Sequence, residues 1–73
     1  MKYAVVIEVQ FESKNLSAHV PDLPGCVSTG DTVEELMRNI REAIELHLRG
    51  MREDGDPIPE PTTRVDYAEV VPG

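Results

Sequence analysis

A change of hydrophobic period at residues 30–35 constrains the fold of this chain more than any other feature. Before it, in "YAVVIEVQF" at 3–11, every odd position is apolar, which is the period of a β-strand. After it, apolar residues recur at intervals of three and four between Val33 and Met51, which is the period of an amphipathic helix. A chain with both patterns in this order is predicted to pack one helix against a small sheet.

Three further segments complete the predicted order. The run "LSAHV" at 16–20 resumes the alternation after the polar residues "ESKN", and this predicts a β-hairpin with the first strand. We expect a short third strand, "CVST", at 26–29 and a last strand, "RVDYAEVV", at 64–71. The first strand is apolar on both faces near its start, so we expect it to be central. The predicted fold is α+β, a β-β-β-α-β two-layer sandwich with one helix packed on a small, mostly antiparallel sheet.

The turns and helix boundaries are marked by residue types with known local roles. Thr32 and Glu35 form a capping-box pattern, in which each side chain bonds the other's free backbone N–H. Asp31 and Glu34 offer the same pattern one residue earlier, so the sequence leaves two positions for the helix start. Gly50 is one candidate helix end, but Met51 continues the apolar stripe, and Gly55 followed by Pro57 is a firmer stop signal. In "VPDLPGC" the prolines preset φ, and the glycine permits turn conformations that other residues avoid. The motif residues with these structural roles are Pro21, Asp22, Pro24, Gly25, Cys26, Gly30, Thr32, Glu35, Pro57 and Pro59.

Size and charge limit the classes of function. The 73 residues leave room for one domain over 1–73, and its small core makes self-association, as a dimer or tetramer, a reasonable expectation. Fourteen acidic against seven basic residues give a net charge of -7, which disfavours nucleic acid and favours a basic protein partner. No apolar run approaches the ~20 residues of a membrane helix, and no signal peptide pattern precedes the first strand. The cytoplasm is the expected location.

Cysteine and histidine do not point to catalysis or to a bound cofactor. A single cysteine excludes an internal disulfide, and Cys26 has no base near it in the sequence, so we expect a small, partly buried apolar residue. His19 is predicted on the outer face of the sheet and His47 in the apolar stripe of the helix. Their spacing matches no metal-binding motif. We therefore expect no metal and no cofactor.

A two-metal nuclease is the sharpest enzyme alternative. Glu8, Glu42 or Glu45, and Asp66 lie on the predicted first strand, helix and last strand, where such an enzyme places its carboxylates. However, Glu42 and Glu45 lie opposite the apolar stripe and should point to solvent. We therefore predict that the chain is not an enzyme.

Four segments together resemble the N-terminal domain of HicB-type antitoxins, the small acidic proteins that neutralise HicA-type ribonuclease toxins. These are "VPDLPGC" (20–26), "GDTVEE" (30–35), "IREAIELHL" (40–48) and "GDPIPEP" (55–61). The resemblance covers most of the chain and implies a partial ribonuclease H-like fold and a dimer or larger assembly. Complete members carry a C-terminal DNA-binding domain that these residues do not include, so we expect no direct DNA binding from them.

The resemblance and the charge together predict a non-catalytic antitoxin that binds a small basic HicA-type toxin and occludes its active or RNA-binding surface. Exposed carboxylates would speed the association. The candidate toxin-binding residues are Asp22, Asp31, Glu53, Asp54 and Asp56. The alternative is a stand-alone oligomeric module of the same fold, structural or adaptor in role, with no toxin partner.

Overall fold

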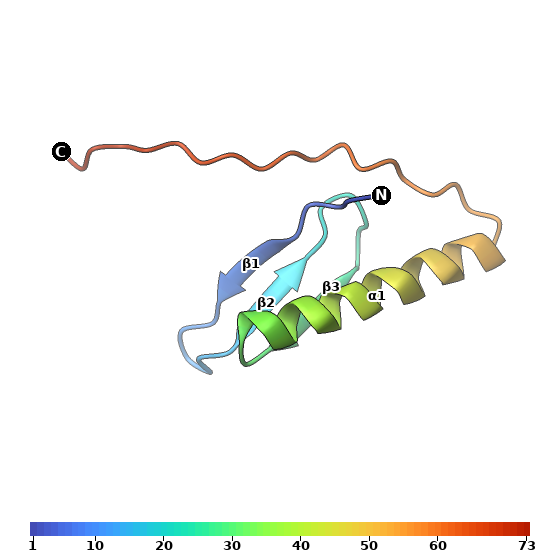
Figure 1. Ribbon diagram of the computed structural model, residues 1–73, viewed down its shortest axis with the longest axis horizontal. Coiled ribbons are helices and arrows are strands. Elements are labelled where there is room, and N and C mark those ends of the chain that lie inside the picture. The colour runs from blue at the N-terminus through green and yellow to red at the C-terminus, as the bar shows by residue number, and fades with distance from the viewer.

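A computed structural model describes residues 1–73. Its elements are β1 (Val6–Val9), β2 (Leu16–His19), β3 (Val27–Gly30) and α1 (Val33–Glu53). The strands form one antiparallel sheet in the order β1-β2-β3, and α1 lies across one face of it (Figure 1). The predicted α+β class is confirmed. The chain has no helix with the length and apolar character needed to cross a membrane.

The core lies between α1 and the strands β2 and β3. Alternation along β2 turns Leu16 and Ala18 toward α1, and the turn after β2 adds further apolar side chains to the same layer. From the other side, Leu36 and Ile40 of α1 are fully buried. The buried core consists of Ala18, Val20, Leu23, Cys26, Leu36 and Ile40. The apolar stripe predicted for the helix is therefore the face that closes the core.

Small side chains on β3 determine where α1 lies. Ser28 and Gly30 pair with the core-facing residues of β2 and so face α1, as does the buried Cys26 just before them. A Cβ on Gly30 would lie 2.7 Å from the backbone nitrogen of Leu36, which is closer than real Cβ atoms approach. The helix backbone can therefore approach β3 closely, and α1 covers β3 and β2 while it stays clear of β1.

The corresponding face of β1 is apolar but open. Ile7 pairs with Ala18, and Val9 pairs with Leu16, so these β1 residues face the same way as the core. They nevertheless remain 40% and 56% exposed, and Phe11 is 90% exposed. The prediction that this strand is central is wrong, because β1 is an edge strand. Apolar residues on both faces of a strand indicate that both faces are covered by other side chains. They carry no information on whether the backbone of the strand is hydrogen-bonded on both of its edges.

Both ends of α1 follow the predicted signals. The Glu35 N–H donates to Thr32 Oγ1 at 3.0 Å, which confirms Thr32 as the N-cap and one of the two bonds of the predicted capping box. At the other end Gly55 has φ +74°, and the Asp56 N–H donates to the Met51 carbonyl at 2.8 Å. This is the left-handed glycine closure that commonly ends helices. It confirms the predicted stop at Gly55.

The last strand predicted over 64–71 is not formed. After α1 the chain returns in an extended conformation and runs in the same direction as β1 (Figure 1), but no backbone hydrogen bond joins it to the sheet. We call residues 57–73 the C-terminal tail. Its β-rich sequence specifies an extended backbone, whereas a strand also needs an edge within hydrogen-bonding distance. The resemblance to a partial ribonuclease H-like fold stays a prediction.

Candidate functional site

One carboxylate in the turn between β2 and β3 holds the C-terminal tail. Asp22 accepts hydrogen bonds from the backbone N–H groups of Thr62 and Thr63, each at 3.0 Å, and from their hydroxyls at 3.0 and 2.7 Å. The Tyr3 hydroxyl adds a bond to the Pro59 carbonyl at 2.6 Å. We call Asp22, Thr62 and Thr63 the tail anchor. It joins two proline-rich segments that lie 40 residues apart in the sequence.

The donors of the tail anchor shift the titration of the carboxylate they surround. They lower the pKa of Asp22 from its ordinary value of 3.8, with the backbone N–H of Thr63 as the largest cause and the hydroxyl of Thr63 as the next. All four groups donate to the ionised carboxylate, and protonation removes part of its capacity to accept. The anchor is therefore tightest when Asp22 is ionised.

The turn presents Asp22 to the tail because its neighbours are fixed in the core. Leu23 and Cys26 are buried, and the Leu23 N–H donates to the Val20 carbonyl at 3.0 Å. Gly25 has φ +84°, a left-handed conformation that favours glycine. The segment therefore connects β2 to β3 through a turn whose apolar residues are buried, and its rigidity stays a prediction. Cys26 was expected to be partly buried and is fully buried in the core, and this burial raises the pKa of its thiol.

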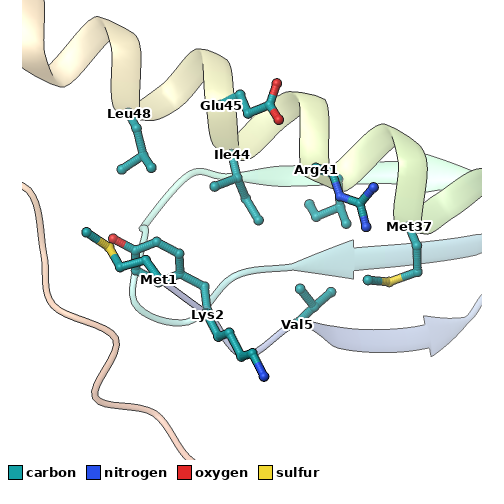
Figure 2. A pocket seen from close by; sticks show the side chains of 10 residues that line it. Met1, Lys2, Val5, Met37, Arg41, Ile44, Glu45 and Leu48 are labelled. Atoms are coloured by element: carbon teal, nitrogen blue, oxygen red, sulfur yellow. The ribbon is translucent and has the colours of Figure 1, made fainter.

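An apolar groove of about 550 Å³ lies between α1 and the start of the chain (Figure 2). Six of its residues are Tyr3, Val5, Met37, Ile40, Ile44 and Leu48, and we call it the β1 groove. In Figure 2, Ile44 and Leu48 point from α1 toward Met1 across the groove. Charged residues also line it, namely Lys2, Arg41 and Glu45. Its charges are thus two basic residues and one acidic residue, in a chain whose net charge is -7.

The structure does not bring the five candidate toxin-binding carboxylates together. Asp31 lies just before the start of α1, whereas Glu53, Asp54 and Asp56 lie at its C-terminal end. A helix of 21 residues separates these two positions by about 30 Å. We call Glu53, Asp54 and Asp56, all exposed, the helix-end acidic patch. Asp22 lies apart from both and is occupied by the tail. The predicted site therefore divides into one local patch and two separate residues.

The residues considered for catalysis also lie apart. No group of three or more His, Cys, Asp or Glu side chains is placed to hold a metal ion. Glu8 faces outward beside His19, with 3.9 Å between the carboxylate and the ring Nδ1, and Asp66 lies in the tail. His47 is half-buried on α1. The carboxylates considered for a two-metal nuclease are therefore not brought together to hold a metal ion.

Sequence reasoning did not identify the tail anchor or the β1 groove. Nothing near Asp22 in the sequence marks Thr62 and Thr63 as its partners, because the contact depends on the path of the tail. The sequence did contain a pattern that could have indicated the β1 groove. The apolar alternation over 3–11 is longer than the four-residue strand Val6–Val9 that forms, so part of it was available for another surface.

Comparisons with known proteins identify relatives over nearly the whole chain. A family model described as "HicB_like antitoxin of bacterial toxin-antitoxin system" matches residues 3–72. An uncharacterized 14.9 kDa protein of Haemophilus phage HP1 is 45% identical over 60 residues, which are 82% of this chain and 44% of the phage protein. The chain thus spans less than half of that relative.

Two relatives of more similar length are described as UPF0150 proteins. The one from Synechocystis is 40% identical over 58 residues, 80% of this chain and 72% of the relative. The one from Archaeoglobus fulgidus is 43% identical over 58 residues, 77% of this chain and 83% of the relative. No solved structure gives a significant match.

Proposed function

The chain belongs to the HicB-like antitoxin family of bacterial toxin–antitoxin systems, and on this premise we propose that it binds and neutralises a small basic ribonuclease of the HicA type. The mechanism is occlusion, in which the bound chain covers the active or RNA-binding surface of the toxin and carries out no chemical step. The observation that carries the proposal is the family match over residues 3–72. We place the encounter in the cytoplasm, where the toxin cleaves mRNA.

The charge of the chain supports a basic partner. The helix-end acidic patch carries three exposed carboxylates within four residues, and the 3.9 Å contact between His19 and Glu8 lies elsewhere. An unpaired acidic patch attracts a basic protein and raises the rate of encounter. The closure at Gly55 holds the patch in one conformation, so binding loses less entropy there. Apolar contacts are expected to supply most of the affinity.

The remaining two candidate toxin-binding residues, Asp31 and Asp22, have different roles in this proposal. Asp31 is exposed beside the start of α1 and is free to meet a second basic side chain. Asp22 already accepts four hydrogen bonds from Thr62 and Thr63. We therefore assign Asp22 the role of positioning the tail, since direct contact with a toxin would require it to give up some of these bonds.

The direct test is an RNA-cleavage assay with the small basic protein encoded beside the gene of this chain. We expect that protein to cleave RNA alone and to lose the activity when the chain is added at a 1:1 ratio. A stable complex in which cleavage persists would contradict occlusion. Full cleavage without any complex would contradict the antitoxin function of this chain.

The helix-end acidic patch has its own test. The triple variant Glu53→Gln, Asp54→Asn, Asp56→Asn should slow association with the toxin by about tenfold at low salt, and the difference should shrink as salt screens the charges. The control Glu8→Gln, Glu12→Gln, Glu42→Gln removes the same number of charges elsewhere. Equal slowing by both variants would show that only the net charge matters.

A stand-alone oligomeric module is the second candidate function. It is favoured by the open β1 groove and by the exposed residues 64–71 of the C-terminal tail, which make no backbone hydrogen bond to the sheet. The basic residues at the groove, which do not suit a basic toxin, also favour it. The gene neighbourhood separates the two functions. An adjacent gene for a small basic protein favours the antitoxin, and an unrelated neighbour favours the stand-alone module.

A further inference from the structure

Two exposed apolar surfaces of the chain differ in the sign of their charge. The β1 groove has two basic residues and one carboxylate among its lining residues. Residues 64–71, which we call the tail strand, carry two carboxylates, Asp66 and Glu69, against one basic residue. A basic protein therefore meets like charge at the β1 groove and opposite charge at the tail strand. Of the two surfaces, charge favours the tail strand for a basic partner.

The tail strand exposes four large apolar side chains. Their exposed fractions are 52% for Val65, 91% for Tyr67, 78% for Val70 and 92% for Val71. Single exposed apolar residues are normal on a protein surface, whereas a continuous group of them is typical of a binding site. Burial of such side chains supplies affinity. The tail strand can therefore provide the apolar contacts that the binding of a toxin requires.

The backbone of the tail strand is also available to a partner. Residues 64–71 make no backbone hydrogen bond to the sheet. A cavity of about 300 Å³ lies between Val65 and Tyr67 on one side and residues 5–7 on the other. An extended segment that pairs with no strand of its own domain can add to the open edge of a sheet in another protein. Such addition supplies main-chain hydrogen bonds besides the side-chain contacts.

The tail anchor fixes the point at which the tail strand begins. Asp22 accepts four hydrogen bonds from Thr62 and Thr63, directly before the strand. From there the strand runs out beside the domain (Figure 1), and the radius of gyration is 14.4 Å, compared with roughly 11 Å for a compact domain of this length. A segment held at its start loses less entropy on binding than a free one.

We propose that the tail strand is the segment by which this chain grips its toxin, and that it adds as a strand to an open sheet edge of that basic protein. The inference rests on the proposed function, since it takes the toxin as the partner. Tyr67 and the exposed valines pack on the toxin, while Asp66 and Glu69 meet its basic side chains. Asp22 is then a positioning residue, because it holds the strand that makes these contacts.

Amide hydrogen exchange, measured by NMR, tests the pairing. The ¹⁵N-labelled full-length chain is compared alone and in a 1:1 mixture with the small basic protein encoded beside its gene. We expect the amides of residues 64–71 to exchange fast in the chain alone. In the complex every second amide should slow by at least about tenfold, because alternate N–H groups of an edge strand face its partner.

The outcomes of this experiment separate the inference from the proposed function. A complex in which the amides of residues 64–71 still exchange fast would overturn the inference and leave the antitoxin function intact. The absence of any complex would overturn both. Slow exchange of the same amides in the chain alone would show that the tail strand is already paired, and this too would overturn the inference.

Substitution of an exposed aromatic residue tests the apolar contact. Tyr67→Ser should raise the dissociation constant of the toxin by at least about tenfold. Phe11→Ser is the matched control, because Phe11 is 90% exposed and lies outside the tail, and it should leave the constant within about twofold. Circular dichroism checks that both variants are folded. An unchanged constant for Tyr67→Ser, or equal losses for both variants, would contradict docking by the tail strand.

A double-mutant cycle tests the positioning role of Asp22. Asp22→Asn should weaken toxin binding by about threefold to tenfold, because the strand then begins from a loose point. In the Tyr67→Ser chain the same change should have a smaller effect, since the strand that Asp22 positions contributes less there. Equal effects in both chains would show that Asp22 acts independently of the tail strand, and would overturn its positioning role.

Discussion

The residues of β3 that face α1 are small, whereas the residues of β1 that face the same way are large. On β3 they are Ser28 and Gly30, and the helix lies directly on them. On β1 they include Ile7 and Val9, which remain substantially exposed. A helix buries the most surface where its backbone can approach the sheet closely. The difference shows that the small side closes the domain, and that the large side is left for other contacts.

The two sides also differ in what they contribute to folding. On the closed side Leu36 and Ile40 are fully buried, and each such side chain stabilises the fold by about 1.5–3 kcal/mol. On the open side Ile7 keeps 40% of its surface in water and contributes less. The closed side therefore supplies most of the packing stability of the domain, and the open side supplies less.

The largest expected effect compares the same substitution on both sides. Ile40→Ala should lower the free energy of unfolding by about 3 kcal/mol, because it leaves a cavity in the core. Ile7→Ala should cost less than about 1 kcal/mol in dilute solution, where its side chain is partly hydrated. Urea denaturation of both variants measures the difference. Equal losses in dilute solution would show that the side of β1 is closed within the monomer.

Gly30 tests why α1 lies on the side of β3. Gly30→Ala places a Cβ 2.7 Å from a backbone nitrogen and 2.9 Å from the Cα of Leu36, so the helix must shift, at a cost of about 2 kcal/mol. Gly50→Ala is the control, because nothing lies within 4 Å of its added Cβ, and it should stabilise the helix by about 0.5–1 kcal/mol. Thermal unfolding distinguishes them. A neutral Gly30→Ala would show that close approach does not position the helix.

The cap of α1 is expected to have a smaller effect. Thr32→Ala removes the acceptor for the Glu35 N–H and should lower the free energy of unfolding by about 1 kcal/mol. Thr32→Ser keeps a hydroxyl at the same place and should retain most of the stability. Urea denaturation measures both variants. Losses of equal size would indicate that packing of the threonine methyl group, and not the hydrogen bond, stabilises this end of the helix.

The smallest effect is confined to the tail and depends on pH. Because the pKa of Asp22 is lower in the anchored state than its ordinary value of 3.8, the released state binds the proton more tightly. The anchoring contribution is therefore fully present above that ordinary value and is lost as the pH falls through the lower folded pKa. NMR shifts of the Thr62 and Thr63 amides should report this titration, while the core resonances stay unchanged.

Asp22→Asn is the control for the titration. It should abolish the pH dependence of the Thr62 and Thr63 amide shifts and leave the rest of the spectrum similar. An apparent pKa at or above 3.8 in the unchanged chain would contradict the anchor, because the four donors stabilise the ionised form. Such a result would show that Asp22 does not hold Thr62 and Thr63 in solution.

Features that depend on neighbouring residues could be read from the sequence. Thr32 and Glu35 lie three residues apart, so the cap was predictable, and the stop at Gly55 was equally local. The buried character of Cys26 and the apolar stripe of α1 followed from periodicity and residue type. Of the candidate binding residues, the sequence could identify exposed carboxylates such as Glu53, but it could not show that Asp31 lies about 30 Å from them.

By itself the sequence determined the α+β class, the hairpin, the helix with both its ends and the membership of the family, because each of these follows from residue types at short and regular spacing. Only the tertiary structure decided that β1 is an edge, that Asp22 holds Thr62 and Thr63, and that residues 64–71 stand away from the sheet. The physical reason is that local patterns specify backbone conformation and the face that is buried. Pairing between distant segments depends instead on the space that packed side chains leave between them, and here Ser28 and Gly30 admit the helix on one side while Ile7 and Val9 remain uncovered on the other.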